Sequence, residues 1–190
     1  MFFYEIRLFS RGGQGGVTAA KLLALAGSYN GYETQAIPKY GAERKGAPLF
    51  VDVRLADGPI RRHAPVVLSE ADHFIVLEPT LIEKLPKVFT KNVIIVVNTD
   101  KAPEEIPVNT KLGIVDAYGI ADTTGLVKSG TRLVSSIMLG AWMKATEMIK
   151  MENTEKAVRK MYSGKMADQN IKAIKLAYDQ FRFIESALVH

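Results

Sequence analysis

The feature that most constrains this chain is a glycine run near its start, with glycine at four of the five positions from 12 to 16. Residues 3–9, before the run, are short and apolar-rich, which is typical of a buried strand. Residues 16–30, after it, repeat apolar side chains at helical spacing, and Gly31 follows where a left-handed helix cap is expected. Residues 33–37 indicate a second strand. The chain is therefore predicted to open with a strand–helix–strand unit whose first turn is almost bare backbone.

Later apolar runs predict further strands. Residues 73–78 and 92–98 are continuous apolar runs, as in the core of a parallel sheet, and residues 112–117 indicate another strand. Residues 48–60 alternate apolar and polar side chains and turn at Asp57-Gly58-Pro59, which predicts a strand followed by a hairpin or an edge excursion.

The helical signals come mainly from the second half of the chain. Thr80 to Glu83 match a capping box, which predicts a short crossover helix. Helices are predicted over residues 132–150, 154–164 and 168–188, the last two split by Gly164. Alternating strands and helices predict a single α/β domain over residues 1–190. Its sheet is expected to be Rossmann-like and mostly parallel, with helices on both faces and a helical C-terminal segment over roughly residues 118–190.

Composition excludes several classes of site. The chain has no cysteine, which rules out disulfides, thiolate-bound zinc, iron–sulfur clusters on this chain and a cysteine nucleophile. Its three histidines are scattered and predict no metal site. The net charge of +5 suits a phosphate-bearing ligand or an acidic partner chain rather than nucleic acid. Neither a signal peptide nor a membrane span is indicated, so a cytoplasmic location is expected.

The glycine run is predicted to bind an anion. A loop between a strand and a helix N-terminus presents free amides and the positive end of the helix dipole to a phosphate. Arg11 adds a cation and Thr18 a hydroxyl group. The dinucleotide-binding fingerprint is incomplete, because its third position falls on Thr18 and the second strand ends in Pro38 and Lys39 rather than an acidic residue. NAD binding is therefore disfavoured. A purely structural alternative is that the glycines allow a tight turn and close helix–strand packing.

A second cluster lies in the loop of residues 40–48, where Glu43, Arg44 and Lys45 stand between glycines. Two adjacent cations on a permissive backbone suit a phosphate or a carboxylate. The alternative is a solvated charged loop. Glu43 is the best candidate for a catalytic group. The simpler interpretation is that its carboxylate forms an ion pair with its basic neighbours.

With these motifs the chain resembles the gamma subunit of the 2-oxoacid:ferredoxin oxidoreductases, above all the pyruvate type. The matching stretches are RGGQGGVTAAKLLA (11–24), QAIPKYGAERKGAPLFVDVRLADGPI (35–60), VNTD (97–100), MLGAWMKAT (138–146) and QNIKAIKLAYDQF (169–181). Lys45 stands where the family often has arginine, and Ala47 where many relatives have glycine. The RGGQG and GAP forms favour the pyruvate or branched-chain class over the 2-oxoglutarate class.

The resemblance implies a multisubunit enzyme. Such an enzyme decarboxylates a 2-oxoacid on thiamine diphosphate, passes electrons through [4Fe-4S] clusters to ferredoxin, and releases an acyl-coenzyme A. Alpha, beta and ferredoxin-like delta subunits are expected to hold the thiamine diphosphate, magnesium and clusters. The present chain agrees, because it has neither cysteine nor a GDG motif. Alone it is expected to be inactive and to self-associate, as a homodimer.

On this resemblance, the two loops are expected to bind coenzyme A phosphates or to close the shared active-site region. The residues concerned are Arg11, Gly12, Gly13, Gln14, Gly15, Gly16, Thr18, Arg44 and Lys45. No catalytic residue is assigned. Two other functions stay open: a free-standing nucleotide-binding domain with flavin or NAD, and an architectural protein whose loops only dock partners. The 2-oxoacid also stays open between pyruvate, branched-chain 2-oxoacids and 2-oxoglutarate.

Overall fold

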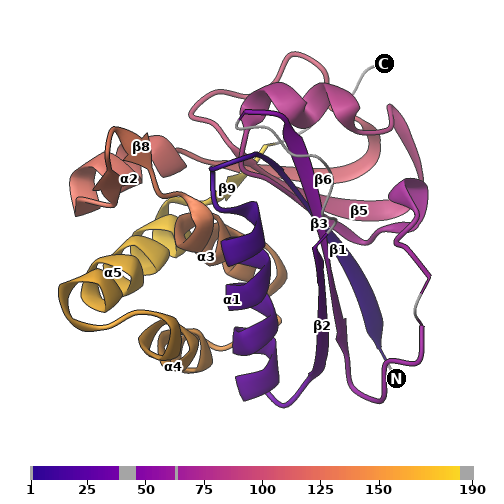
Figure 1. Cartoon of the computed structure of the whole chain (residues 1–190). Coiled ribbons are helices and arrows are strands. Elements are labelled where there is room, and N and C mark those ends of the chain that lie inside the picture. Colours follow the sequence, from indigo (N-terminus) through magenta and orange to yellow (C-terminus); the bar gives the residue numbers. More distant parts are fainter. Residues whose placement is uncertain (1, 39–45, 63, 185–190) are drawn as a thin grey trace.

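The computed structural model describes residues 2–38, 46–62 and 64–184 and shows a sheet with α-helices packed against it (Figure 1). The strands of the main sheet are β1 (Phe3–Arg11), β2 (Glu33–Pro38), β3 (Pro48–Ala56), β4 (His73–Val76), β5 (Val88–Asn98), β6 (Val108–Val115) and β9 (Arg182–Phe183). The α-helices are α1 (Gly16–Tyr29), α2 (Ala117–Thr124), α3 (Ser135–Thr146), α4 (Met151–Met161) and α5 (Gly164–Gln180). Shorter elements are the 3-10 helices η1 (Leu68–Glu70) and η2 (Pro79–Lys84) and a small hairpin of β7 (Val127–Lys128) and β8 (Thr131–Arg132).

The main sheet is mixed but mostly parallel. Its strand order is β2-β3-β1-β4-β5-β6-β9. Parallel pairs join β1, β4, β5 and β6, whereas β3 is antiparallel to both β1 and β2. β2 therefore points the same way as β1, and β3 and β9 run against the other strands of the sheet. The expected α/β fold with a mostly parallel sheet is confirmed.

The position of β3 differs from the sequence-based expectation. The opening strand–helix–strand unit forms, but β3 is inserted into it, so that Val53 lies between Ile6 of β1 and Ala36 of β2. The hairpin or edge excursion expected at residues 57–59 is wrong. After the turn the chain forms no further strand in residues 60–62 and 64–67, and instead crosses the sheet as a strap towards β4.

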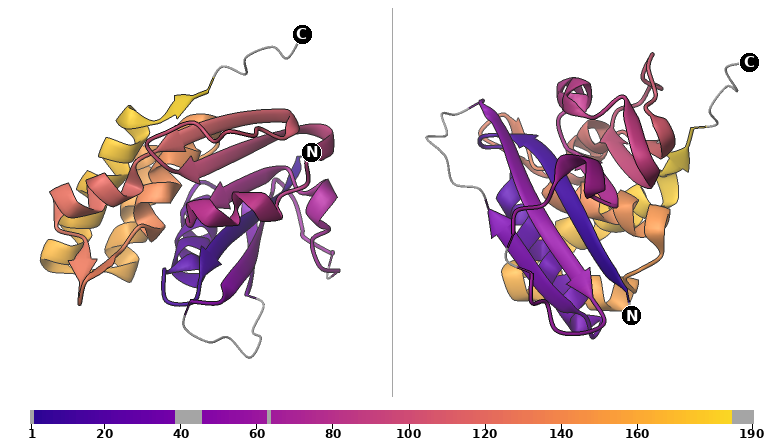
Figure 2. Two further views of the ribbon diagram at one scale, coloured as in Figure 1. Left: turned by 90° about the horizontal axis from the view of Figure 1, so that it is seen from above. Right: turned by 90° about the vertical axis from the view of Figure 1, so that its right-hand side faces the viewer.

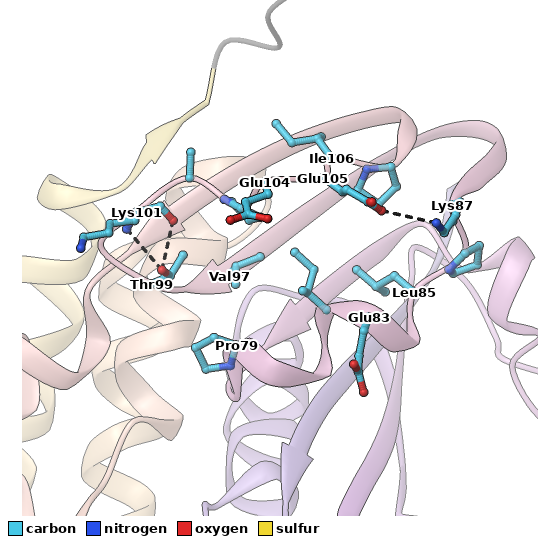
Figure 3. Close-up of a pocket in the computed structure, with 15 residues that line it drawn as sticks. Pro79, Glu83, Leu85, Lys87, Val97, Thr99, Lys101, Glu104, Glu105 and Ile106 are labelled. Atoms are coloured by element: carbon cyan, nitrogen blue, oxygen red, sulfur yellow. Dashed lines mark hydrogen bonds and ion pairs between the residues drawn. The ribbon is translucent and has the colours of Figure 1, made fainter.

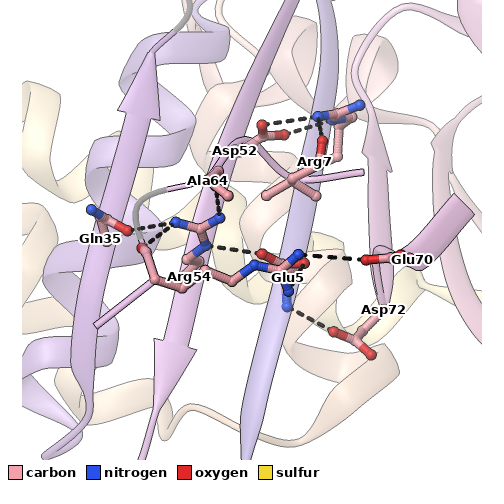
Figure 4. Close-up of polar contacts among 10 residues, drawn as sticks. Glu5, Arg7, Gln35, Asp52, Arg54, Ala64, Glu70 and Asp72 are labelled. Carbon is pink, nitrogen blue, oxygen red and sulfur yellow. Dashed lines mark hydrogen bonds and ion pairs between the residues drawn. The ribbon is translucent and has the colours of Figure 1, made fainter. Parts of the chain in front are cut away.

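Buried charges hold this strap against the sheet (Figure 4). Side chains alternate along a strand, so Glu5 and Arg7 of β1 face away from α1, as do Asp52 and Arg54 of β3. Arg7 donates two hydrogen bonds to Asp52, at 2.6 and 2.9 Å, and a third to the Val66 carbonyl oxygen at 2.7 Å. Arg54 pairs with Glu5 at 2.9 Å and donates to two further strap carbonyl groups. The pairs of Arg7 with Asp52 and of Arg54 with Glu5 join residues more than 40 positions apart, so the strand pattern alone could not predict them.

The two faces of the sheet are covered differently (Figure 2). All five α-helices contribute to the core on one face, where Ile6 and Leu8 of β1 lie with Trp142 of α3. The core on the other face contains Phe9 and Phe74, and no α-helical residue of the described ranges is among its buried members. That face is covered by η1, η2 and the strap. Helical segments therefore lie on both faces, but those on the second face are short 3-10 helices. An apolar groove of about 790 Å³ lies between one of them, η2, and the connection of residues 99–107 (Figure 3).

The C-terminal segment is helical as expected, with shorter helices. The predicted helix over 132–150 is realised as α3, which ends where Glu147 takes a left-handed conformation with φ 53°. α5 stops at Gln180, and the chain then pairs with β6 as β9. None of the helices in the described ranges combines the length and apolar character needed to cross a bilayer.

Candidate functional site

The glycine loop lies where β1 ends and α1 begins. Gly13 and Gly15 have φ values of +93° and +85°, a conformation that other residues adopt only with strain. Gly16 is needed for a different reason, because a Cβ there would lie 2.1 Å from the Ser10 Oγ. The glycines therefore do allow a tight turn and close helix–strand packing, as the purely structural alternative states.

The loop nevertheless keeps unpaired donors. Gly12 N donates to the Ala47 carbonyl oxygen at 2.9 Å, and Gln14 N to the Arg11 carbonyl oxygen at 3.0 Å. The first-turn amides of α1 have no intrahelical acceptors, and no hydrogen bond within the described ranges uses those of residues 16–18. The N-cap Gly15 offers no side chain, and the first turn contains no acidic residue. The positive end of the α1 dipole is thus left without a compensating protein group.

A second helix N-terminus meets the loop. A Cβ at Gly15 would lie 3.3 Å from the Cβ of Ser135, the first residue of α3. α3 also lacks a side-chain cap and an acidic residue in its first turn. Two uncapped helix N-termini therefore converge at the carboxyl edge of the sheet, where ligands bind in open α/β folds.

Arg11 and Gln14 fix the shape of the loop. The Arg11 guanidinium donates to the Gly46 carbonyl oxygen at 3.1 Å and to the Thr80 Oγ1 at 2.9 Å. The Gln14 amide oxygen accepts from Arg11 N at 2.8 Å, and the Gln14 amide nitrogen donates to Glu78 at 2.6 Å. Arg11 is exposed enough at this edge to meet a ligand, and its backbone position is set by the loop itself.

Glu78, just after β4, is the centre of a polar cluster that the sequence analysis missed. Its carboxylate accepts hydrogen bonds from Gln14, from Thr80 at 3.0 Å and from Tyr118 at 3.3 Å. Burial raises the pKa of Glu78, but these hydrogen bonds outweigh burial and hold the pKa below its ordinary value. Burial and the Glu78 charge together raise the pKa of Tyr118 to about 12. The predicted capping box is wrong, because η2 has no side-chain cap and Thr80 donates to Glu78 instead.

The neighbouring strand ends are tied together by Asn98 and Asp116. Asn98 donates to the Leu77 carbonyl oxygen at 2.9 Å and accepts from Ala117 N at 2.9 Å, which joins the ends of β4 and β5 to α2. Asp116 accepts from Gly119 N at 2.8 Å as the N-cap of α2.

The structure brings most of the predicted site residues together. Arg11, Gly12, Gly13, Gln14, Gly15, Gly16 and Thr18 form the loop and the first turn of α1. Glu43, Arg44 and Lys45 lie outside the described residues. Within the ranges that are described, no group of three or more histidine, aspartate or glutamate side chains is placed to hold a metal ion.

Sequence reasoning missed Glu78, Tyr118, Ser135 and Arg132, whose guanidinium lies 5.6 Å from the centre of the Tyr118 ring. A usable signal existed for the first two. Glu78 is the last residue of one apolar run predicted as a strand and Tyr118 directly follows another, and the carboxyl ends of parallel strands meet at one edge. Ser135 carries no such signal, because only the packing of α3 brings it to the loop.

Comparison with known proteins identifies relatives over nearly the whole chain. The family model described as pyruvate ferredoxin/flavodoxin oxidoreductase matches residues 5–180. The pyruvate/ketoisovalerate oxidoreductases common subunit gamma of Pyrococcus abyssi is 37% identical to this chain. The match covers 95% of this chain and 98% of that protein's length. The crystal structure of pyruvate oxidoreductase subunit PORC from Thermotoga maritima is 30% identical with a TM-score of 0.76, covering 97% of this chain and 100% of that one.

A more distant solved structure shares the fold alone. The 2-oxoglutarate:ferredoxin oxidoreductase from Magnetococcus marinus, solved with 2-oxoglutarate, coenzyme A and succinyl-CoA, is 16% identical with a TM-score of 0.75. The match covers 95% of this chain but 31% of that one, so there the fold is one part of a longer chain. On the family match and the full-length relatives, the chain belongs to the pyruvate ferredoxin/flavodoxin oxidoreductase family.

Proposed function

We propose that this chain is the gamma subunit of a multisubunit 2-oxoacid:ferredoxin oxidoreductase, with pyruvate as the 2-oxoacid. In that reaction the 2-oxoacid loses carbon dioxide, two electrons pass to ferredoxin, and the acyl group joins the thiol of coenzyme A. The full-length match to relatives with gamma-subunit and PORC names supports this role. The alpha, beta and delta subunits hold the thiamine diphosphate and magnesium, and they also hold the [4Fe-4S] clusters, since this chain has no cysteine to bind a cluster.

The glycine loop supplies part of the coenzyme A site by binding a phosphate group. The observation that carries this proposal is the meeting of two uncapped helix N-termini beside Arg11. Free amides and a guanidinium are the donors that phosphate oxygens accept from best. Glu78 has a positioning role at this site, because its carboxylate accepts hydrogen bonds from Gln14, Thr80 and Tyr118 and so holds Gln14 in the loop. Arg44 and Lys45 join the site from the adjoining loop on the grounds of sequence alone.

The test places a negative charge in the loop without disturbing its packing. A Cβ at Gly13 would meet no atom within 4 Å, and aspartate tolerates the left-handed backbone better than most residues. In the assembled enzyme, Gly13→Asp should raise the apparent KM for coenzyme A. Loss of one charge-assisted contact of about 1.5–3 kcal/mol corresponds to about 10- to 100-fold. The KM for pyruvate should stay unchanged.

The matched control is Gly31→Asp. Gly31 has φ +89° and equally open surroundings, but lies at the other end of α1, roughly 20 Å away. It carries the same charge and backbone strain and should leave the KM for coenzyme A unchanged. Arg44→Ala with Lys45→Ala should raise that KM as well. If both variants assemble normally and have the same KM for coenzyme A, the phosphate role is refuted. If Gly13→Asp alone prevents assembly, the result favours a docking role for the loop.

A further inference from the structure

The sequence contains one asparagine followed directly by glycine, Asn30–Gly31, at the C-terminal end of α1. Asparagine deamidates most readily before glycine, because a glycine nitrogen has no side chain beside it to hinder its approach to the preceding side chain. In that reaction the Gly31 nitrogen bonds to the Asn30 Cγ, the C–N bond of the side-chain amide breaks, and ammonia leaves with the proton of the Gly31 amide. Water then opens the resulting succinimide ring to aspartate or isoaspartate. The pair is therefore reactive wherever the backbone lets these two atoms meet.

The folded backbone keeps the two atoms apart. Asn30 has φ −82° and ψ 0°, so the Gly31 nitrogen is eclipsed with the Asn30 nitrogen and turned away from the Asn30 Cβ. The Gly31 N–H also donates to the Ser28 carbonyl oxygen at 3.0 Å. Ring closure needs a rotation about ψ that brings the Gly31 nitrogen alongside the Asn30 side chain, and this rotation breaks that hydrogen bond. Deamidation is therefore blocked while the end of α1 keeps its native conformation.

The Asn30 side chain is held by a second element. Its Nδ2 donates to the Met148 carbonyl oxygen at 3.2 Å, and its Oδ1 accepts from Lys150 N at 3.1 Å and from Asn153 Nδ2 at 2.9 Å. The Tyr32 hydroxyl group donates to the same Met148 carbonyl oxygen at 2.7 Å. Met148 and Lys150 lead into α4, which packs against α1 (Figure 1). These contacts form a joint between the end of α1 and the start of α4, and Cγ cannot turn to meet the attacking nitrogen until the joint opens.

We propose that Asn30 is a deamidation site of this chain that reacts only when the start of α4 detaches from α1, and that the product weakens the joint. A carboxylate at position 30 has no N–H to donate to the Met148 carbonyl oxygen, so two acceptors face each other where a hydrogen bond stood. Isoaspartate also lengthens the main chain by one carbon atom just before Gly31, whose φ of +89° shapes the end of the helix. A reversible opening of the joint is thus made irreversible by a step that needs only water, independently of the oxidoreductase role.

The first test compares deamidation rates of the full chain at mildly alkaline pH by peptide mass spectrometry. In native buffer the peptide that contains Asn30 should deamidate about tenfold more slowly, or slower still, than in the urea-unfolded chain. Tyr32→Phe and Asn153→Ala each remove one contact of the joint and should speed the native reaction about two- to tenfold. The matched control is Tyr29→Phe, because Tyr29 is exposed in the last turn of α1, and its rate should equal that of the parent chain.

A further control separates opening of the joint from unfolding of the whole chain. Ile95→Val removes one buried methylene group from the core on the other face of the sheet. This change lowers global stability about as much as one lost hydrogen bond does, but leaves the joint intact. The native deamidation rate should therefore stay at that of the parent chain.

The second test concerns the product of the reaction. Asn30→Asp reproduces the aspartate form and should raise the equilibrium constant of unfolding about tenfold in urea titrations, because it leaves a partly buried acceptor unpaired. The matched control is Asn92→Asp, which places the same charge at an exposed position of β5 and should change that constant much less.

If Asn30 deamidates equally fast in the native and unfolded chains, the fold does not protect it. If Tyr32→Phe and Asn153→Ala leave the rate unchanged, the end of α1 protects Asn30 alone and α4 has no part. If Ile95→Val speeds the reaction as much as they do, the whole chain must unfold first. If Asn30→Asp unfolds no more readily than Asn92→Asp, the product does not weaken the joint. Each of these results would overturn the proposal, and none bears on the gamma-subunit role.

Discussion

His73 should make the stability of this protein fall steeply in mild acid. Its ring is buried on the α-helical face of β4, stacked on Tyr4 at 5.2 Å and edge-on to Trp142 at 5.9 Å. The His73 Nδ1 is buried and has no hydrogen-bond partner among the described residues. Burial lowers the pKa of His73 from 6.5 to about 4, against the opposing effect of Asp72. The folded protein therefore excludes a proton that the unfolded chain accepts.

The sign and size of the effect follow from proton linkage. Between pH 6.5 and about 4 the unfolded state binds more protons at this position, so the free energy of unfolding decreases as pH falls. From pH 7 to pH 5 the loss from His73 alone is about 2 kcal/mol, rising to about 3 kcal/mol near pH 4. The Glu78 pKa lies below its ordinary value, so the stability that Glu78 contributes is lost only at lower pH. The interval from pH 7 to pH 5 therefore isolates the histidine.

The assay is urea unfolding followed by fluorescence of Trp142, the one tryptophan of the chain, which is fully buried. His73→Phe keeps an aromatic ring and removes the titration. The parent chain should lose about 2 kcal/mol more than the variant between pH 7 and pH 5, and the other histidines cancel in this difference. Parallel pH profiles for the two proteins, within about 0.5 kcal/mol, would refute the argument, because a burial penalty of this size could not then exist.

Two further predictions concern packing and buried charge. Gly16→Ala should destabilise the fold by about 1–3 kcal/mol because its Cβ would overlap the Ser10 Oγ, and Ser10→Ala should recover part of the loss in denaturant titrations. No change on Gly16→Ala would mean that the loop relaxes freely. Arg54→Met should cost about 3–5 kcal/mol because it leaves the buried Glu5 with only its longer ion pair to the partly exposed Arg62, at 3.5 Å, and adding Glu5→Gln should restore stability. A double variant no more stable than Arg54→Met would show that the strap carbonyl groups, rather than Glu5, need the arginine.

The local parts of the site could be predicted from the sequence. Glycine conformations and helix starts depend on neighbouring residues, so the turn at residues 12–16 and the left-handed Gly31 were both foreseeable. The Thr80 capping box failed because a tertiary acceptor, Glu78, competes for the same hydroxyl group. The hairpin at residues 57–59 failed because buried arginines, absent from any local pattern, hold the following residues as a strap.

By itself, the sequence determined the alternation of strands and helices, the bare junction after the first strand and the absence of any cysteine chemistry, because each depends on residue type or on spacing of a few residues. Only the tertiary structure decided that β3 separates β1 from β2, that α3 directs a second helix N-terminus at the glycine loop, and that one face is left with an apolar groove. These features join segments many residues apart. Such pairings are chosen by the burial of whole faces and by buried charges that must find partners, and neither appears in a local pattern.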